Sequence, residues 1–354
     1  MGVSTTPAQP TAVLPRGVLV LVGLAAATIV IAGMRGIADL LAPLFLALVL
    51  TVLAHPLRRW LGAKLPSWVA ATVCIAAVYL GVVLFALAVV VSVARFATLL
   101  PSYTDEFAGQ VDDLTTWLKD AGVDQSQIDR VASSFDLGQL GGFLGDLLGE
   151  LMGLVSNLFF ILALVLFMTV DGTSFPRQLQ RARSAKPAII DGLEEFAHGT
   201  RRYLGVATVF GLIVAVLDAV ALVILGVPLA LTWGLLAFIT NYIPNIGFVI
   251  GLIPPAILAL LEGGPSLMIA VIAVYCVLNV VIQSVIQPKV VGDAVGLSTT
   301  LSFFSLIFWT WVIGPLGAIL AIPLTLFAKA LLVDADPDTR WLRPLISNQD
   351  EPVT

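Results

Sequence analysis

Long apolar runs separated by short polar segments make up most of the chain. An α-helix rises about 1.5 Å per residue, so about 20 apolar residues cross the hydrocarbon core of a bilayer. Most of the runs are long enough for this, and the pattern predicts an all-α integral membrane protein with about eight membrane segments. The runs cover about 17–33, 37–54, 67–94, 151–170, 204–226, 229–261, 265–287 and 300–332.

Basic residues between the runs predict the orientation of the chain. Arg58, Arg59 and Lys64 follow the second run, and six Lys or Arg residues lie between the fourth and fifth. Short loops rich in Lys and Arg face the cytoplasm. We therefore expect both loops and both termini to be cytoplasmic, with a disordered tail at 1–16 and a second tail at 334–354.

The segment 95–150 separates the first three transmembrane helices, 17–94, from an expected transport core, 151–333. It carries ten acidic and three basic residues, and apolar residues recur within it at helical spacing. In the expected topology this segment lies outside the cell. We predict a small extracytoplasmic subdomain of amphipathic helices that lies on the membrane.

Glycines recur every four residues where this subdomain leads into the fourth apolar run. Small residues at this spacing let two helices approach closely. The stripe is either a subunit interface or a packing surface within one subunit, and the sequence leaves both open. Its members are Gly141, Gly145, Gly149 and Gly153.

The run 229–261 is too long for one ordinary span and contains helix breakers at its centre. Pro244, Asn245 and Gly247 split it into halves of about 15 residues, and each half rises only about 22 Å. Irregular backbone is tolerated at membrane depth only where it is buried in protein or lines a wet cavity. We predict a re-entrant helical hairpin with its turn at these residues.

The last run, 300–332, breaks in the same way at Gly314, Pro315 and Gly317. A shift of 70 residues lays the two broken runs over each other, with six identities in 17 positions. The expected topology inserts the two hairpins from opposite sides, which makes them an inverted repeat. In secondary transporters such a repeat marks a substrate site at the midplane. The alternative is that both are kinked packing helices.

Polar side chains inside the apolar runs are candidates for that site. Asn279, Gln283 and Gln287 recur every four residues and form a polar stripe on one helix between the hairpins. In hydrocarbon these amides need partners, so the stripe either lines a pathway or bonds to another helix. The candidate pathway residues are Asn241, Pro244, Asn245, Gly247, Asn279, Gln283, Gln287, Gly314, Pro315 and Gly317.

Asp218 is the one acidic residue inside the fifth apolar run. Removal of a carboxyl group from water disfavours its charged form, which suits a carrier of protons or cations. Asp218 is therefore the candidate for ion coupling. The alternatives are a position near the outer interface or a hydrogen bond to the backbone of a hairpin.

The composition limits the function classes. Hydrophobic residues make up 59% of the 354 residues and charged residues only 12%, too few to cover a soluble domain of this size. The net charge of −5 gives no reason to expect nucleic-acid binding. The two histidines lie far apart and the two cysteines lie in apolar runs, so no metal site is expected. Without a catalytic triad or a P-loop pattern, we expect neither an enzyme nor a cofactor.

Several stretches together resemble the autoinducer-2 exporter family of bacterial membrane transporters. They are LGVPLALTWGLLAFITNYIPNIGFVIGLIPPAILALLEGG at 225–264, IQPKVVGDAVGLS at 286–298 and FWTWVIGPLGAILAIPL at 308–324. The resemblance implies a multi-pass protein of the bacterial inner membrane with an extracytoplasmic helical insert and self-association into a ring-like homo-oligomer. Activities ascribed to the family are export of autoinducer-2 and, in some members, exchange of sodium or lithium for protons.

We predict a secondary transporter that exports a small polar solute such as the autoinducer-2 signal. Alternating access would take place at a midplane site between the two re-entrant hairpins. The closest alternative is a sodium (lithium)/proton antiporter that uses Asp218. An alternative of another class is a non-transporting membrane scaffold that recruits partners through segment 95–150.

Overall fold

The computed structural model describes residues 15–99, 158–171, 175–244, 246–287 and 296–336, with single positions beyond these ranges. Every described element is a helix, which confirms the all-α class. The N-terminal elements are α1 (Arg16–Gly36), α2 (Ala38–Gly62), α3 (Ser67–Leu99), α7 (Leu158–Asp171), α8 (Phe175–Ala185) and α9 (Pro187–Ile224). The C-terminal elements are α10 (Ala230–Thr240), α11 (Gly247–Asn279), the π-helix η2 (Val280–Ile286), α13 (Thr299–Ile313), α14 (Pro315–Lys329) and the π-helix η3 (Ala330–Asp334). Most of the expected subdomain at 95–150 lies outside the described residues.

Several helices match the requirements of a membrane span. The following described stretches are long enough and apolar enough to cross a membrane: Ala38–Gly62, Trp68–Ser92, Pro187–Ile224, Gly247–Ile286 and Pro315–Asp334. Shorter apolar helices of 10–17 residues include α10 and α13. The first arm of each predicted hairpin is therefore a short helix, as the sequence pattern requires.

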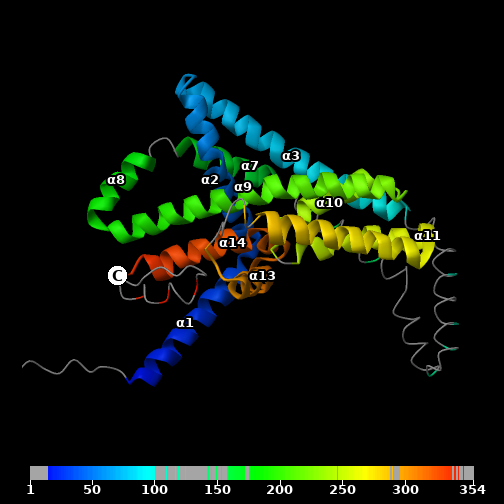
Figure 1. Cartoon of the computed structure of the whole chain (residues 1–354). Helices are drawn as coiled ribbons and strands as arrows, with labels where there is room; N and C mark the ends of the chain where they lie inside the picture. Colours follow the sequence, from blue (N-terminus) through cyan, green and yellow to red (C-terminus); the bar gives the residue numbers. More distant parts are fainter. Residues whose placement is uncertain are drawn as a thin grey trace, which may run out of the picture.

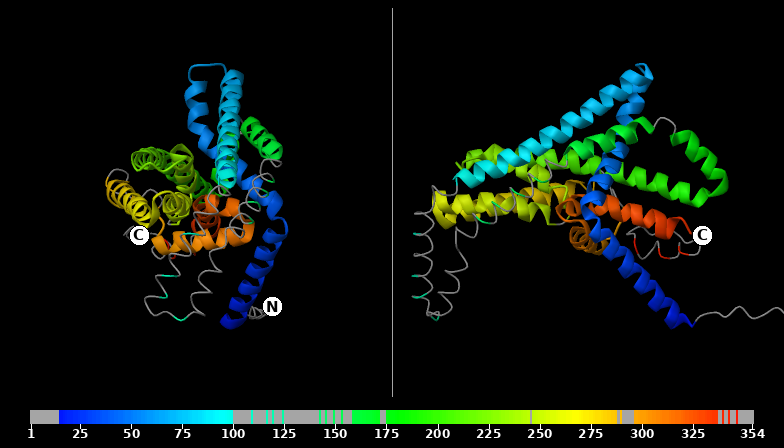
Figure 2. Two further views of the ribbon diagram at one scale, coloured as in Figure 1. Left: turned by 90° about the vertical axis from the view of Figure 1, so that its right-hand side faces the viewer. Right: turned by 180° about the vertical axis from the view of Figure 1, so that it is seen from behind.

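α3, α9 and α11 run along the molecule, whereas α1, α2 and α13 run in other directions (Figure 1 and Figure 2). Figure 1 shows α3, α9 and α11 extending along the molecule toward its right-hand side. α8 and the turn between α2 and α3 lie on its left-hand side. The left view of Figure 2 looks along α9, and α13 lies across that direction. α10 packs against both α9 and α3, and α14 packs against α9 and α2. The two hairpins therefore have different arrangements, although their sequences match.

Both predicted helix breaks are present in the fold. α10 ends at Thr240 and α11 begins at Gly247, while α13 ends at Ile313 and α14 begins at Pro315. Gly314 joins the second pair with φ of 75°, a conformation that favours glycine. The paired helices α10 and α11, and α13 and α14, lie against each other.

Gly247 and Gly317, which occupy equivalent positions in the two hairpins, have the same steric role. A Cβ atom at Gly247 would overlap the backbone oxygen of Thr240, and one at Gly317 would overlap the backbone oxygen of Trp309. In each hairpin the second helix therefore passes directly against the last carbonyl groups of the first. Because the 70-residue shift aligns Gly247 with Gly317, the repeat seen in the sequence is also a repeat of the turn.

A second aligned pair of glycines lies just before the hairpins. Gly226 has φ of 74° and Gly296 has φ of 65°, and each precedes a buried apolar residue, Val227 or Leu297. L-residues rarely adopt positive φ, so both positions require a residue without a Cβ atom. The two halves of the repeat therefore share the conformation of this glycine. The residues at the starts of the helices differ, because Leu229 before α10 is left-handed with φ of 58° and Ser298 before α13 is extended with φ of −65°.

Gly263 and Gly264 divide α11 into two arms. Their backbone is not helical, with φ and ψ of −138° and 15° at the first and 70° and −167° at the second. Pro265 follows them directly. The break falls at the boundary that the sequence predicts between the first hairpin and the next span.

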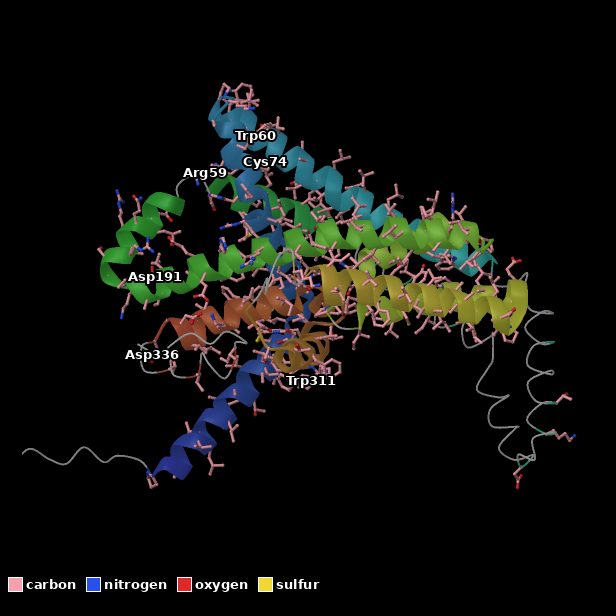
Figure 3. All side chains as sticks on the ribbon, in the orientation of Figure 1. Arg59, Trp60, Cys74, Asp191, Trp311 and Asp336 are labelled. Carbon is pink, nitrogen blue, oxygen red and sulfur yellow. The ribbon has the colours of Figure 1, made fainter. Side chains whose placement is uncertain are left out.

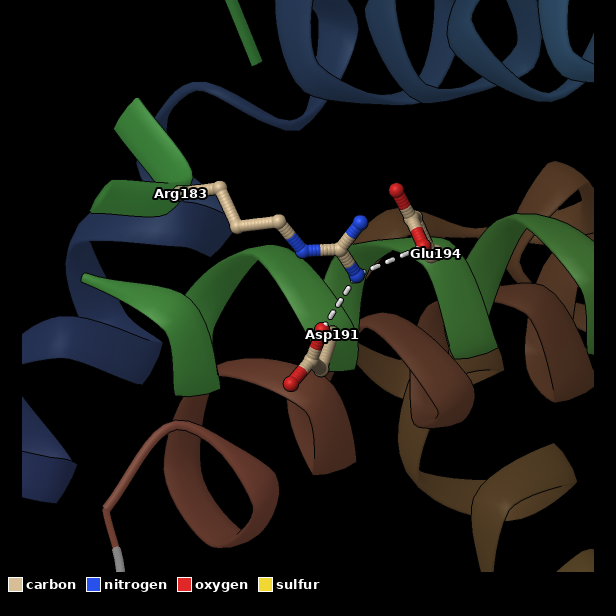
Figure 4. A network of polar contacts seen from close by, with 3 residues as sticks. All are labelled: Arg183, Asp191 and Glu194. Carbon is tan, nitrogen blue, oxygen red and sulfur yellow. Dashed lines mark hydrogen bonds and ion pairs between the residues drawn. The ribbon is translucent and has the colours of Figure 1, made fainter. Parts of the chain in front are cut away.

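Ion pairs join the helices at the end of the molecule that carries α8. Figure 4 shows Arg183 of α8 between Asp191 and Glu194 of α9, with 3.1 Å from Nη2 to the Glu194 carboxylate. The hydrogen bond to Asp191 and the two nearby carboxylates raise the pKa of Arg183 above its usual value. Lys329 of α14 pairs with Glu195 of α9 at 2.6 Å. These contacts hold α8 and α14 against the first turns of α9.

We predict that Gly247→Ala and Gly317→Ala destabilise the protein, because either methyl group would overlap a backbone oxygen that cannot move freely. Overpacking of this kind costs about 1–3 kcal/mol. Gly205→Ala is the matched control, since no described atom lies within 4 Å of the methyl group that it adds to α9. Thermal unfolding in detergent measures the effect. Equal unfolding temperatures for all three variants would contradict the close approach of the hairpin arms.

Candidate functional site

Four hydrogen bonds made by side-chain amide groups connect α9, the turn between α10 and α11, the end of α11 and η2. The amide nitrogen of Asn241, directly after α10, donates to the backbone oxygen of Ala207 in α9 at 2.8 Å. The Asn241 oxygen accepts a bond from Gln283 at 3.0 Å. Gln283 also donates to the Asn279 oxygen at 2.7 Å, and Asn279 donates to the backbone oxygen of Tyr275 at 2.8 Å. The predicted amides therefore form one connected network.

The network forms one wall of a small cavity. The space open to the centre of a water-sized sphere is about 10 Å³, close to the minimum that one water molecule needs. It is lined by Val214, Asp218, Ala237, Asn241, Phe248, Tyr275, Asn279 and Gln283. Residues from α9, α10, α11 and η2 thus meet at one polar point inside an apolar bundle.

Asp218 supplies the one carboxyl group among the described residues that line this cavity. Its side chain is 0% exposed, and neither carboxyl oxygen has a hydrogen-bond partner among the described residues. The hydroxyl of Tyr275, which is 1% exposed, also lacks a partner there. Buried polar groups are almost always hydrogen-bonded, so unsatisfied ones call for a specific explanation. The explanation that the location offers is a group bound in the cavity, such as a proton on Asp218, a water molecule, a cation or a polar solute.

Helix α9 also holds the turn of the first hairpin. Tyr203 donates its hydroxyl hydrogen to the backbone oxygen of Tyr242 at 3.0 Å, and the hydroxyl groups of Thr208 and Tyr242 lie 2.8 Å apart. Gly211 makes room for the neighbouring amide, because a Cβ atom there would lie 2.6 Å from the nitrogen of Asn241. The turn residues are therefore fixed by partners on a separate helix.

The structure brings four of the predicted residues together: Asn241, Asn279, Gln283 and Asp218. Gln287 is half-buried and does not line the cavity. Pro244 and Gly247 shape the hairpin turn, and Asn245 lies outside the described residues.

The turn of the second hairpin is not part of the cavity. Gly314, Pro315 and Gly317 lie beside an apolar cluster that includes Ile313 and Ala318. The first hairpin reaches the same cluster through the partly buried side chains of Tyr242, Ile243 and Ile246. The two turns therefore meet through apolar packing, while the polar cavity lies between the first hairpin, α9 and α11.

The glycine stripe has no described partner. Gly145, Gly149 and Gly153 are exposed, and no described atom lies within 4 Å of a Cβ atom built on them. Gly141 falls outside the described residues. The stripe stays a predicted packing surface.

Tyr275 and Gly211 belong to the site but were not among its predicted residues. Tyr275 precedes Asn279 by four positions, so it extends the polar stripe by one helical turn. That spacing was available in the sequence. Gly211 gave no such signal, because its role depends on a residue that comes 30 positions later. Among the described residues, no group of three or more His, Cys, Asp or Glu could hold a metal ion.

The described helices, several of them long and apolar enough to cross a membrane, define a multi-pass membrane protein. The chain belongs to the AI-2E family of transporters, which it matches over residues 18–335. It is 30% identical to the AI-2 transport protein TqsA of Escherichia coli K12 over 320 residues, 89% of this chain and 92% of that protein. It is also 30% identical over 316 residues to the putative transport protein YhhT of the same strain, 88% of this chain and 90% of that protein. A putative transport protein of Haemophilus influenzae is 30% identical over 338 residues, 94% of this chain and 97% of that protein.

We predict that Gln283→Leu lowers the stability of the fold. It removes the donor that Asn241 and Asn279 share, and each buried acceptor left unpaired costs about 1–3 kcal/mol. Gln287→Leu makes the same change one helical turn later, at a half-buried side chain outside the network. Thermal unfolding in detergent should therefore show a lower unfolding temperature for Gln283→Leu alone. An equal loss in both variants would mean that the network adds nothing specific.

Proposed function

We propose that this protein is a secondary transporter that exports a small polar solute such as the autoinducer-2 signal. The observation that carries the proposal is the meeting of Asn241, Asn279 and Gln283 at one cavity beside the turn between α10 and α11. Amide groups both donate and accept hydrogen bonds, which suits an uncharged, hydroxyl-rich solute. The name of the TqsA relative, an AI-2 transport protein, agrees with this solute class.

The cavity is too small for such a solute in the present conformation. The cavity has space for about one water molecule, as expected for a conformation in which the solute site is closed. Admission of a solute requires separation of the first hairpin from α9, which breaks the bond from Asn241 to Ala207. The proposed cycle exposes the cavity alternately to the two sides by rocking or sliding of the hairpin unit against α9.

A second candidate function rests on a separate observation. Asp218 is fully buried, has no hydrogen-bond partner among the described residues, and lines a cavity that is large enough for a water molecule or a bare cation. A carboxyl group that binds either a proton or a cation is the central element of a sodium (lithium)/proton antiporter. In that case the phenol of Tyr275 and the amide oxygens would supply the remaining ligands.

The proposed setting is the bacterial inner membrane, with both termini in the cytoplasm and several copies arranged in a ring. Basic residues of the α2–α3 turn and of the α8 region support this orientation, because short loops rich in Lys and Arg are usually cytoplasmic. Gly145, Gly149 and Gly153, exposed in the single chain, are candidates for the contact between copies.

Transport by inside-out vesicles tests the two functions against each other. For the exporter, vesicles that contain the protein should accumulate labelled autoinducer-2 or a related small polyol. Asn241→Leu should reduce the initial rate about tenfold, the value of one lost hydrogen bond of about 1.4 kcal/mol, at equal protein content. Accumulation of none of these solutes, or an unchanged rate in Asn241→Leu, would contradict the exporter.

For the antiporter, a sodium gradient should drive proton flux in proteoliposomes. Asp218→Asn should abolish that flux, because an amide cannot exchange a proton for a cation. Asp39→Asn, the same change at an exposed carboxyl group, should leave it intact. Flux that survives in Asp218→Asn would exclude Asp218 as the coupling residue.

A further inference from the structure

The turn between α2 and α3 presents two tryptophans and two cations on the surface. Trp60 is 57% exposed and Trp68 is 71% exposed. Arg59 and Lys64 are exposed as well, and the ammonium group of Lys64 lies 4.3 Å from the centre of the Trp60 ring. Figure 3 shows Arg59 and Trp60 where this turn projects from the bundle. We call these four residues the α2–α3 cluster.

Neighbouring arginines in this turn have different roles. Arg58 donates to the backbone oxygen of Thr169 at 2.9 Å and so joins α2 to the end of α7. Arg59 has no carboxylate partner among the described residues, and Lys64 contacts only the ring of Trp60 there. The chain itself contains no Asp or Glu from 40 to 104. Among the described residues, no carboxylate forms an ion pair with Arg59 or Lys64.

The cluster lies where two stretches that are long and apolar enough to cross a membrane, Ala38–Gly62 and Trp68–Ser92, come together at their adjoining ends. It is therefore placed at the level of the lipid headgroups. Tryptophan favours that level because its ring is apolar and its N–H group is polar. Lys and Arg at the same level attract anionic lipids.

A second copy of the chain is a poorer match for this surface. It would have to offer carboxylates, and those described near α8 and α14 are already paired. Asp191 and Glu194 contact Arg183, and Glu195 contacts Lys329. An anionic phospholipid supplies the missing negative charge and also covers the exposed indole rings.

We propose that the α2–α3 cluster is a binding site for the phosphate of an anionic phospholipid headgroup. Arg59 and Lys64 bind the phosphate, while Trp60 and Trp68 lie against the glycerol and upper acyl region. The contact with the Trp60 ring holds the Lys64 ammonium group at the indole without neutralising its charge. This site is separate from the amide network and rests on no assumption about the solute.

Native mass spectrometry of the full-length protein in detergent tests the proposal. The dissociation constant for the first phosphatidylglycerol bound is compared with that for phosphatidylcholine of the same acyl chains. Each cation near an anionic headgroup contributes about fivefold in affinity. Arg59→Gln with Lys64→Gln removes two such cations and should therefore weaken phosphatidylglycerol binding about 25-fold. It should weaken phosphatidylcholine binding much less, because the choline of that lipid already offsets the charge of its phosphate.

The matched control is Arg181→Gln with Lys186→Gln, which removes the same charge from exposed positions near α8. The control should change phosphatidylglycerol affinity less than about twofold. Equal losses in both double variants would show diffuse attraction and overturn the site. The same spectra give the number of subunits. A changed subunit number with unchanged lipid affinity would assign the surface to a second copy and also overturn the proposal.

Discussion

A helix that stops at membrane depth leaves carbonyl groups without partners, and hydrocarbon offers none. The arrangement of this protein depends on how that constraint is met at the turn between α10 and α11. Tyr203 of α9 donates to the Tyr242 backbone oxygen, and Gly247 lets the second arm pass directly against the end of the first. α9 is therefore the helix that holds the turn between α10 and α11 in place.

The contacts that satisfy the turn also create the polar site. Asn241 bonds to α9 on one side and to Gln283 on the other, so the hairpin turn connects two long helices. Gln283 lies in the π-helical segment Val280–Ile286. π-Helical turns occur frequently at functional sites and involve a locally altered hydrogen-bond pattern. A movement of α9, of the α10–α11 turn or of η2 would alter the hydrogen bonds of the other two. Such a connection is what a transporter needs to couple binding in the cavity to movement of its helices.

Sequence periodicity predicted the local features well. The positions of proline and glycine predicted both helix breaks. The 70-residue alignment paired Gly247 with Gly317, which have the same steric role. The four-residue spacing placed Asn279 and Gln283 on one face, since i and i+4 are neighbours on a helix.

Long-range relations were beyond the sequence pattern. A period identifies the face of a helix but not the neighbour that covers it. Nothing in the spacing indicated that Asp218 and Tyr275 share a cavity with Asn241. The direction of α13 across the bundle also depends on packing, here around an apolar cluster to which both hairpin turns contribute. For that reason the polar site lies beside the first hairpin rather than at equal distance from the two turns.

The most direct test of this site is its access to water from the two sides of the membrane. Ala237→Cys places a thiol in the cavity wall of a chain whose Cys74 and Cys276 have been replaced by alanine. A membrane-impermeant thiol reagent should label it in both right-side-out and inside-out vesicles, whereas Val277→Cys, 60% exposed on the apolar surface, should stay unlabelled. Labelling of Ala237→Cys from one side only, or from neither side in vesicles that transport, would contradict alternating access at this cavity.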